Sequence, residues 1–182
     1  MNNIYSIENS STDFSYHYYS DITQVPFCCE EAIQNSFEQS LVMNDIDVTE
    51  DLSYKRYLKN CPIILIFKKD LIVGFVNFNY LTSIKALDYN VYINSDQSVY
   101  MLKSICREVI LIYLHIAKDI YIFEMFYFNV SHKVVFSWAK ESLKTGDCVK
   151  IRDNYYVCYG YLNKQYIENI ILKGINILVK NN

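Results

Sequence analysis

The stretch PIILIFKKDLIVGFVNFNYL, residues 62–81, contains two apolar runs that flank a short charged turn. The runs are rich in β-branched residues, which favour strands, and their length is typical of strands. A short polar link between two such runs is typical of a hairpin. The sequence therefore predicts a β-hairpin over 62–81.

Strands and helices alternate after this hairpin. SIKALDYNVYI (83–93) reads as a third strand, with Asp88, Asn90 and Tyr92 on one side. Apolar residues at a 3–4 spacing predict a helix over 98–117, and the nearly continuous apolar run DIYIFEMFYF (119–128) predicts a buried strand. A strand–helix–strand unit within one sheet is parallel and right-handed, so we expect the two strands to lie side by side around the helix.

The rest of the chain completes a mixed α/β single domain. The patterns predict a short strand near 4–7, helices over 28–45, 51–60 and 129–146, a strand pair over 147–162 and an amphipathic helix over 163–182. We divide the chain into an N-terminal extension with the first strand (1–27), a domain (28–162) and the C-terminal helix, packed on the domain or on a partner.

Composition limits the classes of function. The 182 residues carry 17 Lys and Arg against 20 Asp and Glu, a net charge of -3. This balance disfavours nucleic-acid binding and a cationic membrane-surface role. The chain has no 18-residue apolar run and no evident signal peptide, so we expect a cytoplasmic protein. No CxxC pair occurs, and we expect free thiols at all six cysteines: Cys28, Cys29, Cys61, Cys106, Cys148 and Cys158.

The element order resembles the GNAT superfamily of acyl-CoA-dependent N-acyltransferases, especially its ribosomal-protein alanine acetyltransferase branch, over roughly 28–162. The hairpin 62–81, with Gly74 early in its second strand, looks like the central hairpin of that family. Residues 86–93, 126–143 and 153–162 look like its splayed strand, its last core strand with the following helix, and its closing strand. The resemblance implies a central mixed, mostly antiparallel sheet with a splayed parallel pair, flanked by helices.

The resemblance also implies acetyl-CoA or another acyl-CoA as cosubstrate, and no metal. The family holds the diphosphate on a glycine-rich loop, but the matching segment NSDQSVYML (94–102) has no glycine and contains Asp96. Either the Ser98 hydroxyl and the helix N–H groups hold the cofactor here, or the loop holds none. The residues that the resemblance assigns to the cofactor are Tyr92, Ile93, Gln97, Ser98, Asn129 and Ser131.

Two acids are candidates for the base that deprotonates an acceptor amine. Glu124 interrupts an apolar strand, where burial would raise the pKa of its carboxyl, and Asp88 on the preceding strand is the second candidate. Each acid could instead face solvent or pair with a lysine. An acid for the leaving sulfur could come from Tyr127, Tyr159 or Tyr161, unless they are packing residues, and the resemblance places Ser131 at the sulfur.

The sequence thus supports two functions. The first is direct transfer of an acetyl or other acyl group to a primary amine of a protein or small molecule. The alternative is a catalytically inactive GNAT-fold protein that acts as a protein-binding or regulatory module. The missing glycines, Asp96 and the 18 tyrosines favour this alternative. A protein partner or a homodimer is compatible with both functions, and neither involves nucleic acid or a membrane.

Overall fold

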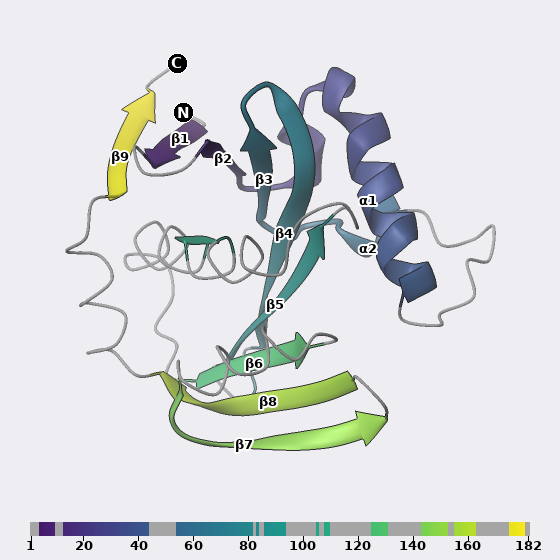
Figure 1. Cartoon of the computed structure of the whole chain (residues 1–182), viewed down its shortest axis with the longest axis vertical. Coiled ribbons are helices and arrows are strands. Elements are labelled where there is room, and N and C mark those ends of the chain that lie inside the picture. Colours follow the sequence, from purple (N-terminus) through teal and green to yellow (C-terminus); the bar gives the residue numbers. More distant parts are fainter. Residues whose placement is uncertain are drawn as a thin grey trace. The chain divides into compact units, whose positions relative to one another are not determined.

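The computed structural model describes the backbone of residues 4–9, 13–43, 54–81, 83, 86–93, 105, 108, 109, 125–130, 143–152, 155–162 and 175–180, and the side chains of part of these. Strands dominate this part of the chain (Figure 1). The elements are β1 (Ile4–Asn9), β2 (Phe14–Tyr19), the 3₁₀ turns η1 (Ile22–Gln24) and η2 (Phe27–Cys29), α1 (Glu30–Met43), α2 (Tyr54–Tyr57), β3 (Ile63–Lys68), β4 (Leu71–Leu81), β5 (Ala86–Ile93), β6 (Met125–Val130), β7 (Leu143–Arg152), β8 (Tyr155–Leu162) and β9 (Ile175–Lys180).

The chain divides into two compact units. The first comprises Met1–Asn77, Val91–Gln97 and Gly174–Asn182, and the second comprises Phe78–Asn90 and Ser98–Lys173. Hydrogen bonds order the strands as β7-β8-β6-β5-β4-β3-β2-β1-β9. Strands β4 and β5 therefore contribute residues to both units. The predicted mixed, mostly antiparallel sheet is confirmed.

In the first unit, β9, β1, β2, β3 and β4 follow one another in antiparallel pairs. The predicted hairpin is confirmed, and Lys69 in its turn adopts a left-handed φ of 56°. The backbone N–H of Lys69 donates to the carbonyl of Asp13 at 3.0 Å, which ties the turn to the start of β2. The register of β3 and β4 shifts between Ile66 and Phe67, so that Val73 is an extra residue in β4.

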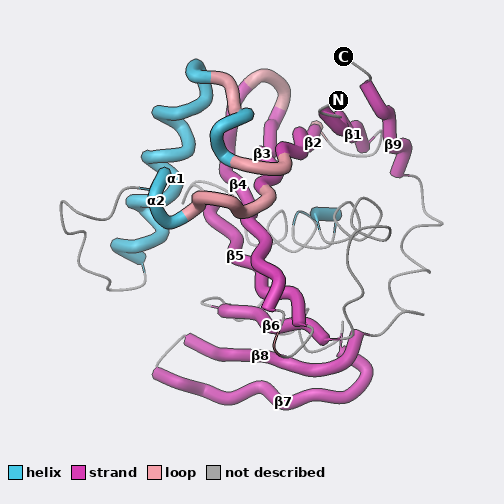
Figure 2. The backbone as a smooth tube through the Cα atoms, turned by 180° about the vertical axis from the view of Figure 1, so that it is seen from behind, coloured by secondary structure: helices cyan, strands magenta, loops and turns pink. Residues whose placement is uncertain are grey.

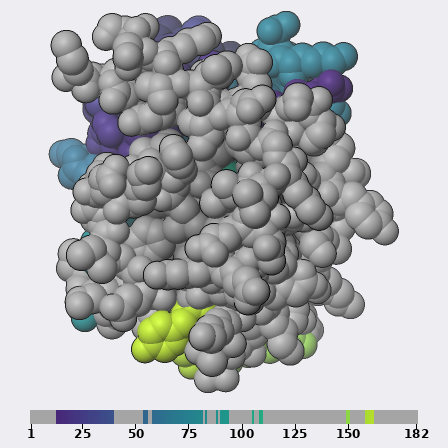
Figure 3. All heavy atoms as spheres, turned by 90° about the vertical axis from the view of Figure 1, so that its left-hand side faces the viewer, coloured from purple at the N-terminus to yellow at the C-terminus, as the bar shows by residue number. Residues whose placement is uncertain are grey.

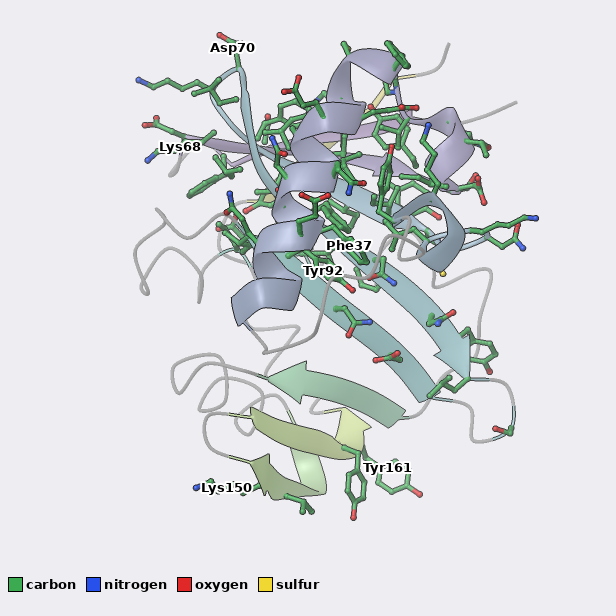
Figure 4. The ribbon with its side chains drawn as sticks, turned by 90° about the vertical axis from the view of Figure 1, so that its right-hand side faces the viewer. Phe37, Lys68, Asp70, Tyr92, Lys150 and Tyr161 are labelled. Atoms are coloured by element: carbon green, nitrogen blue, oxygen red, sulfur yellow. The ribbon has the colours of Figure 1, made fainter. Side chains whose placement is uncertain are left out.

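Helix α1 covers an apolar core in the first unit. Its side chains Ile33 and Phe37 are 0% and 1% exposed, as the helical spacing of the sequence predicts. Phe37 points from α1 toward Tyr92 of β5 (Figure 4). The same core contains Tyr19, Ile22, Val25, Cys29, Tyr54, Leu58, Ile63, Leu65 and Phe75.

Gly74 allows β4 to approach β5 closely in the first unit. A Cβ atom at Gly74 would overlap the carbonyl oxygen of Tyr92 and lie 2.9 Å from the Cα of Ile93. Both neighbouring atoms belong to the backbone, which cannot rotate away as a side chain can. Glycine is therefore required at this position of the strand.

The second unit contains a parallel pair and an antiparallel layer. β5 pairs parallel to β6, as the strand–helix–strand pattern predicts. β6, β8 and β7 then lie side by side in antiparallel pairs (Figure 2). Of the helix predicted over 98–117, the described residues Ile105, Glu108 and Val109 are helical and buried.

The predicted C-terminal helix is wrong for Ile175–Lys180, which form β9 and pair antiparallel with β1. Ile175 fits the helical spacing of the preceding isoleucines, but the segment INILVK also alternates with a period of two and is rich in β-branched residues. Pairing with β1 satisfies the backbone groups along one edge of β9, which is the last strand in the order of the sheet. Residues 163–174 lie outside the described part.

Two other predicted segments need correction. The helix predicted over 129–146 is wrong at both ends. Asn129 and Val130 belong to β6, while Leu143–Arg152 form β7 and Gly146 lies opposite Gly160 of β8 rather than ending a helix. Residues 131–142 lie outside the described part. The irregular stretch predicted before Pro26 contains the strand β2, whose alternation of buried and partly buried residues is masked in the sequence by its tyrosines.

Candidate functional site: the end of the parallel strand pair

The pairing of β5 with β6 ends before the two strands end. Its register covers four residue pairs, from Ala86–Met125 to Tyr89–Phe128. The next residues, Asn90 and Asn129, still belong to β5 and β6. They are not part of the described β5–β6 pairing. β6 remains paired to β8 as far as Val130. The parallel register of the described residues therefore ends inside both strands, at Tyr89 and Phe128.

Asp88 lies within this short parallel pair. Its Oδ1 atom is buried and has no hydrogen-bond partner among the described residues. Burial raises the pKa of the Asp88 carboxyl to about 6, and a hydrogen bond from the Asn90 side chain opposes part of this rise. A carboxyl with this pKa is mostly ionised at neutral pH and close enough to neutrality to exchange protons with a substrate.

The strand register brings one predicted tyrosine to the level of Asp88. Tyr127 of β6 lies directly opposite Asp88, and Tyr159 of β8 lies opposite Tyr127. Tyr161 lies two residues further along β8, opposite Met125. Tyr159 and Tyr161 are 38% and 49% exposed, and this part of β8 reaches the surface (Figure 3).

The side chains of the last two β5 residues, Tyr92 and Ile93, are buried. The Tyr92 ring stacks on Phe75, with ring centroids 4.5 Å apart and planes at 16°, and lies 5.6 Å from the Phe37 ring. Tyr92 and Ile93 are each 8% exposed. Their predicted contact with a cofactor can therefore use only backbone groups, and that role stays a prediction.

Several predicted site residues lie outside the described part of the chain. These residues are Glu124, Gln97, Ser98 and Ser131, together with the whole segment 94–102. Asn129 is placed on β6, opposite Val157 of β8. Of the two acids proposed as base, Asp88 is thus the one whose surroundings are known. Sequence reasoning missed Asn90, although its position two residues after Asp88 on a strand was a usable signal.

A pocket of about 560 Å³ lies elsewhere, in the first unit, and contains none of the predicted site residues. Beside it, Lys55 Nζ lies 2.8 Å from both carboxylate oxygens of Glu30, and the ring of Phe27 is 85% exposed. Its walls come from η2, α1 and α2: Phe27, Cys28, Glu30, Glu31, Gln34, Tyr54 and Lys55. Among the described residues, no group of three potential metal ligands occurs. No helix in the described part is long and apolar enough to cross a membrane.

Comparison with known proteins supports the fold. No protein-family model and no curated protein sequence matches the chain. The solved structure of the AHL synthase LasI is similar over 93% of this chain and 98% of its own, with a TM-score of 0.61 and 11% identity. Mycobacterium smegmatis RimJ in complex with CoA-disulfide is similar over 93% of both chains, with a TM-score of 0.58 and 5% identity.

RimL, a ribosomal L7/L12 alpha-N-protein acetyltransferase, is similar over 86% of this chain and 92% of its own, with a TM-score of 0.51 and 15% identity. These similarities show that the chain has the mixed α/β fold of the GNAT acetyltransferases. RimL is no more similar in structure than LasI, so the fold does not select the ribosomal-protein branch.

Proposed function

We propose that the protein is an acyl-CoA-dependent N-acyltransferase that transfers an acetyl or other acyl group to a primary amine. The single observation that carries this proposal is the interrupted parallel pair, which has a buried carboxyl with a raised pKa beside its end. The GNAT fold gives independent support, because solved structures of this fold include acetyltransferases.

An extended acyl-CoA arm would lie where the described β5–β6 register ends, because peptide-like groups add to a strand through main-chain hydrogen bonds. Acyl-CoA would supply the thioester that is attacked. Asn129, the residue of β6 just beyond the last parallel pair, would hold the arm. The segment 94–102 would hold the diphosphate at the start of the following helix.

Asp88 would take the proton of the acceptor ammonium through Oδ1. The amine nitrogen then forms the new bond to the acyl carbon and releases its second proton to solvent, while the carbon–sulfur bond breaks and the thiolate receives a proton. Tyr127 is the proton donor that the register favours, since it lies opposite Asp88. Glu124 remains the second candidate base, and Ser131 a candidate contact of the sulfur.

The finer assignments are also proposals. We infer acetyl-CoA as the acyl donor, an acceptor amine on a protein or small molecule, and a site of action in the cytoplasm. A protein N-terminus is one acceptor to test, because RimL is described as an alpha-N-protein acetyltransferase.

Mass spectrometry of reactions with acetyl-CoA and a panel of amines, including peptides with free N-termini, tests the proposal. We expect an acetylated product and free thiol in equal amounts, and at least a tenfold lower rate with Asp88→Asn. Asp70→Asn is the matched control, because Asp70 lies exposed in the hairpin turn. An Asp88→Asn variant as active as Asp70→Asn would exclude Asp88 as the base. Absence of product with every amine would favour the inactive protein-binding alternative.

A further inference from the structure

The pocket in the first unit shares no residue with the candidate acyl-transfer site. Its walls come from η2, α1 and α2, and the two helices lie side by side (Figure 1). Its volume of about 560 Å³ falls within the range of small-molecule sites. The pocket is therefore large enough for a small organic ligand, and the chemistry of its walls indicates the class of that ligand.

One wall of the pocket is an exposed aromatic ring. Phe27 of η2 is 85% exposed, whereas Cys29, two residues later, is 7% exposed and belongs to the apolar core. The turn is thus anchored in the core while the Phe27 ring stays outside it. Because an exposed ring contributes little to folding, its apolar surface can be buried against the body of a ligand.

The charged groups of the pocket carry an excess of negative charge. Lys55 Nζ lies 2.8 Å from both carboxylate oxygens of Glu30, so these two charges neutralise each other. Glu31, the next residue of α1, adds a second carboxylate to the walls and is exposed. Two carboxylates against one ammonium oppose the binding of a phosphate or carboxylate and favour a cation.

The pocket also includes a tyrosine whose hydroxyl is unsatisfied. Tyr54 is 6% exposed, and its hydroxyl oxygen is buried without a hydrogen-bond partner among the described residues. Lys55 Nζ lies 5.9 Å from the centroid of the Tyr54 ring, so Tyr54 adjoins the ion pair.

The pKa of Tyr54 reflects the same neighbours. Burial raises this pKa most, and Glu30 adds to the rise while Lys55 opposes it. Neither side chain makes a hydrogen bond of normal geometry with the hydroxyl. A buried polar atom without a partner is unfavourable, and a ligand N–H could donate to this oxygen.

We propose that this pocket binds a small organic cation, an ammonium group attached to an apolar body. The excess carboxylate charge would attract the ammonium, whose N–H groups would donate to the Tyr54 hydroxyl. The apolar body would cover the Phe27 ring. This inference goes beyond the proposed function, because the site uses none of the acyl-transfer residues and would bind its ligand without acyl-CoA.

NMR titration of the ¹⁵N-labelled chain with three probes of similar size tests the proposal. The probes are phenethylammonium, 2-phenylethanol and phenylacetate, which differ in charge at the end of the same aromatic body. We expect phenethylammonium to bind about tenfold more tightly than 2-phenylethanol, and phenylacetate to bind most weakly. Equal affinities, tighter binding of phenylacetate, or no binding of phenethylammonium at about 10 mM would overturn the proposal.

Variants of the pocket locate the bound probe. Glu31→Gln and Phe27→Ala should each weaken phenethylammonium binding about fivefold. Asp70→Asn and Leu71→Ala are the matched controls, because both residues are exposed in the hairpin 62–81, and they should leave the affinity unchanged. The same affinity in the pocket variants and in the controls would place the probe elsewhere and overturn the proposal.

Tyr54→Phe separates binding from folding, because it removes the hydroxyl and keeps the ring. Loss of a hydroxyl without a partner should not lower the thermal midpoint, whereas phenethylammonium binding should weaken about threefold. Unchanged affinity in Tyr54→Phe would overturn the role of the hydroxyl. These titrations contain no acyl-CoA, so their failure and the failure of acyl transfer are separate results.

Discussion

The two ends of β5 differ in how completely their side chains are satisfied. At the end in the first unit, Tyr92 stacks on Phe75 and contacts Phe37, and its neighbour Ile93 is also buried. At the end in the second unit, Asp88 has a buried oxygen without a described partner. One strand thus contains a well-packed segment and a segment whose hydrogen bonding is incomplete.

This difference separates structural from functional demands. Stacked aromatic rings bury a large apolar surface and so contribute to folding. A buried carboxyl with an unpaired oxygen lowers stability, so its presence is explained more readily by chemistry than by folding. Substitutions at the packed end should therefore weaken the fold, whereas substitution of Asp88 should strengthen it and reduce activity.

The largest expected effect is at the packed end. Phe37→Ala removes a ring that is 1% exposed and should lower the free energy of unfolding by about 3–5 kcal/mol. Urea denaturation measures the loss. Phe27→Ala is the control, because Phe27 is 85% exposed, and equal losses in the two variants would contradict the packing described here.

A smaller loss is expected for Gly74→Ala. The added methyl group would overlap the Tyr92 carbonyl, and β4 or β5 would have to shift, at a loss of about 1–3 kcal/mol. The thermal midpoint should fall accordingly. An unchanged midpoint would mean that the two strands do not approach each other as closely as the structure shows.

In contrast to these two variants, Asp88→Asn should raise the free energy of unfolding at neutral pH. Burial raises the Asp88 pKa from 3.8 to about 6, so the native state binds a proton more tightly than the unfolded state. The stability associated with this group is present below pH 3.8 and is lost as the pH rises toward 6. The rise corresponds to at most about 3 kcal/mol, and partial exposure reduces it to about 1–2 kcal/mol.

Denaturation of wild type and Asp88→Asn at several pH values measures this difference. The variant should be the more stable protein at pH 7, and its advantage should shrink as the pH falls from 6 to 4. Asp70→Asn should show no such trend. Parallel stability curves for wild type and Asp88→Asn would contradict a buried, unsatisfied carboxyl.

The smallest effect is expected at Asp21, a satisfied carboxylate. Its Oδ1 accepts from the Thr23 N–H and its Oδ2 from the Asn60 N–H, each at 2.8 Å. Burial would raise the pKa of Asp21, but these hydrogen bonds outweigh it and lower the pKa. Asp21→Ala should lower the free energy of unfolding by about 1 kcal/mol near neutral pH.

The pH dependence at Asp21 is the reverse of that at Asp88. The stability from a lowered pKa is present above the pKa of the unfolded state, 3.8, and is lost as the pH falls through the folded-state value. Urea denaturation should therefore show a smaller difference in unfolding free energy between wild type and Asp21→Ala at pH 3 than at pH 7. An equal difference at both pH values would mean that the Asp21 carboxylate is not held by the two N–H groups.

Much of the fold follows from periodicity in the sequence. The hairpin 62–81, the helix α1 with Ile33 and Phe37 inward, and the parallel pairing of β5 with β6 were all predicted. β2 and β9 were missed because tyrosine is compatible with both buried and polar patterns, and because the isoleucines before β9 fit a helix. Both segments form strands because each pairs with β1, and this pairing cannot be read from the local sequence pattern.

The site was less predictable than the fold. Asp88 was recognised as a possible base, but the sequence could not rank it against Glu124, since burial depends on the neighbouring strands. The sequence also could not show that one Asp88 oxygen lacks a described partner or where the β5–β6 pairing stops. Both are properties of the assembled sheet.

Calorimetric titration with acetyl-CoA and with CoA tests the central claim most directly, because it needs no knowledge of the acceptor. The proposed acyltransferase should bind both ligands with a micromolar Kd, and binding should weaken at least tenfold in Asn129→Ala but not in Asn35→Ala. Absence of binding to the wild-type protein at high concentration would contradict the claim, and equal binding by both variants would exclude Asn129 as a contact of the cofactor.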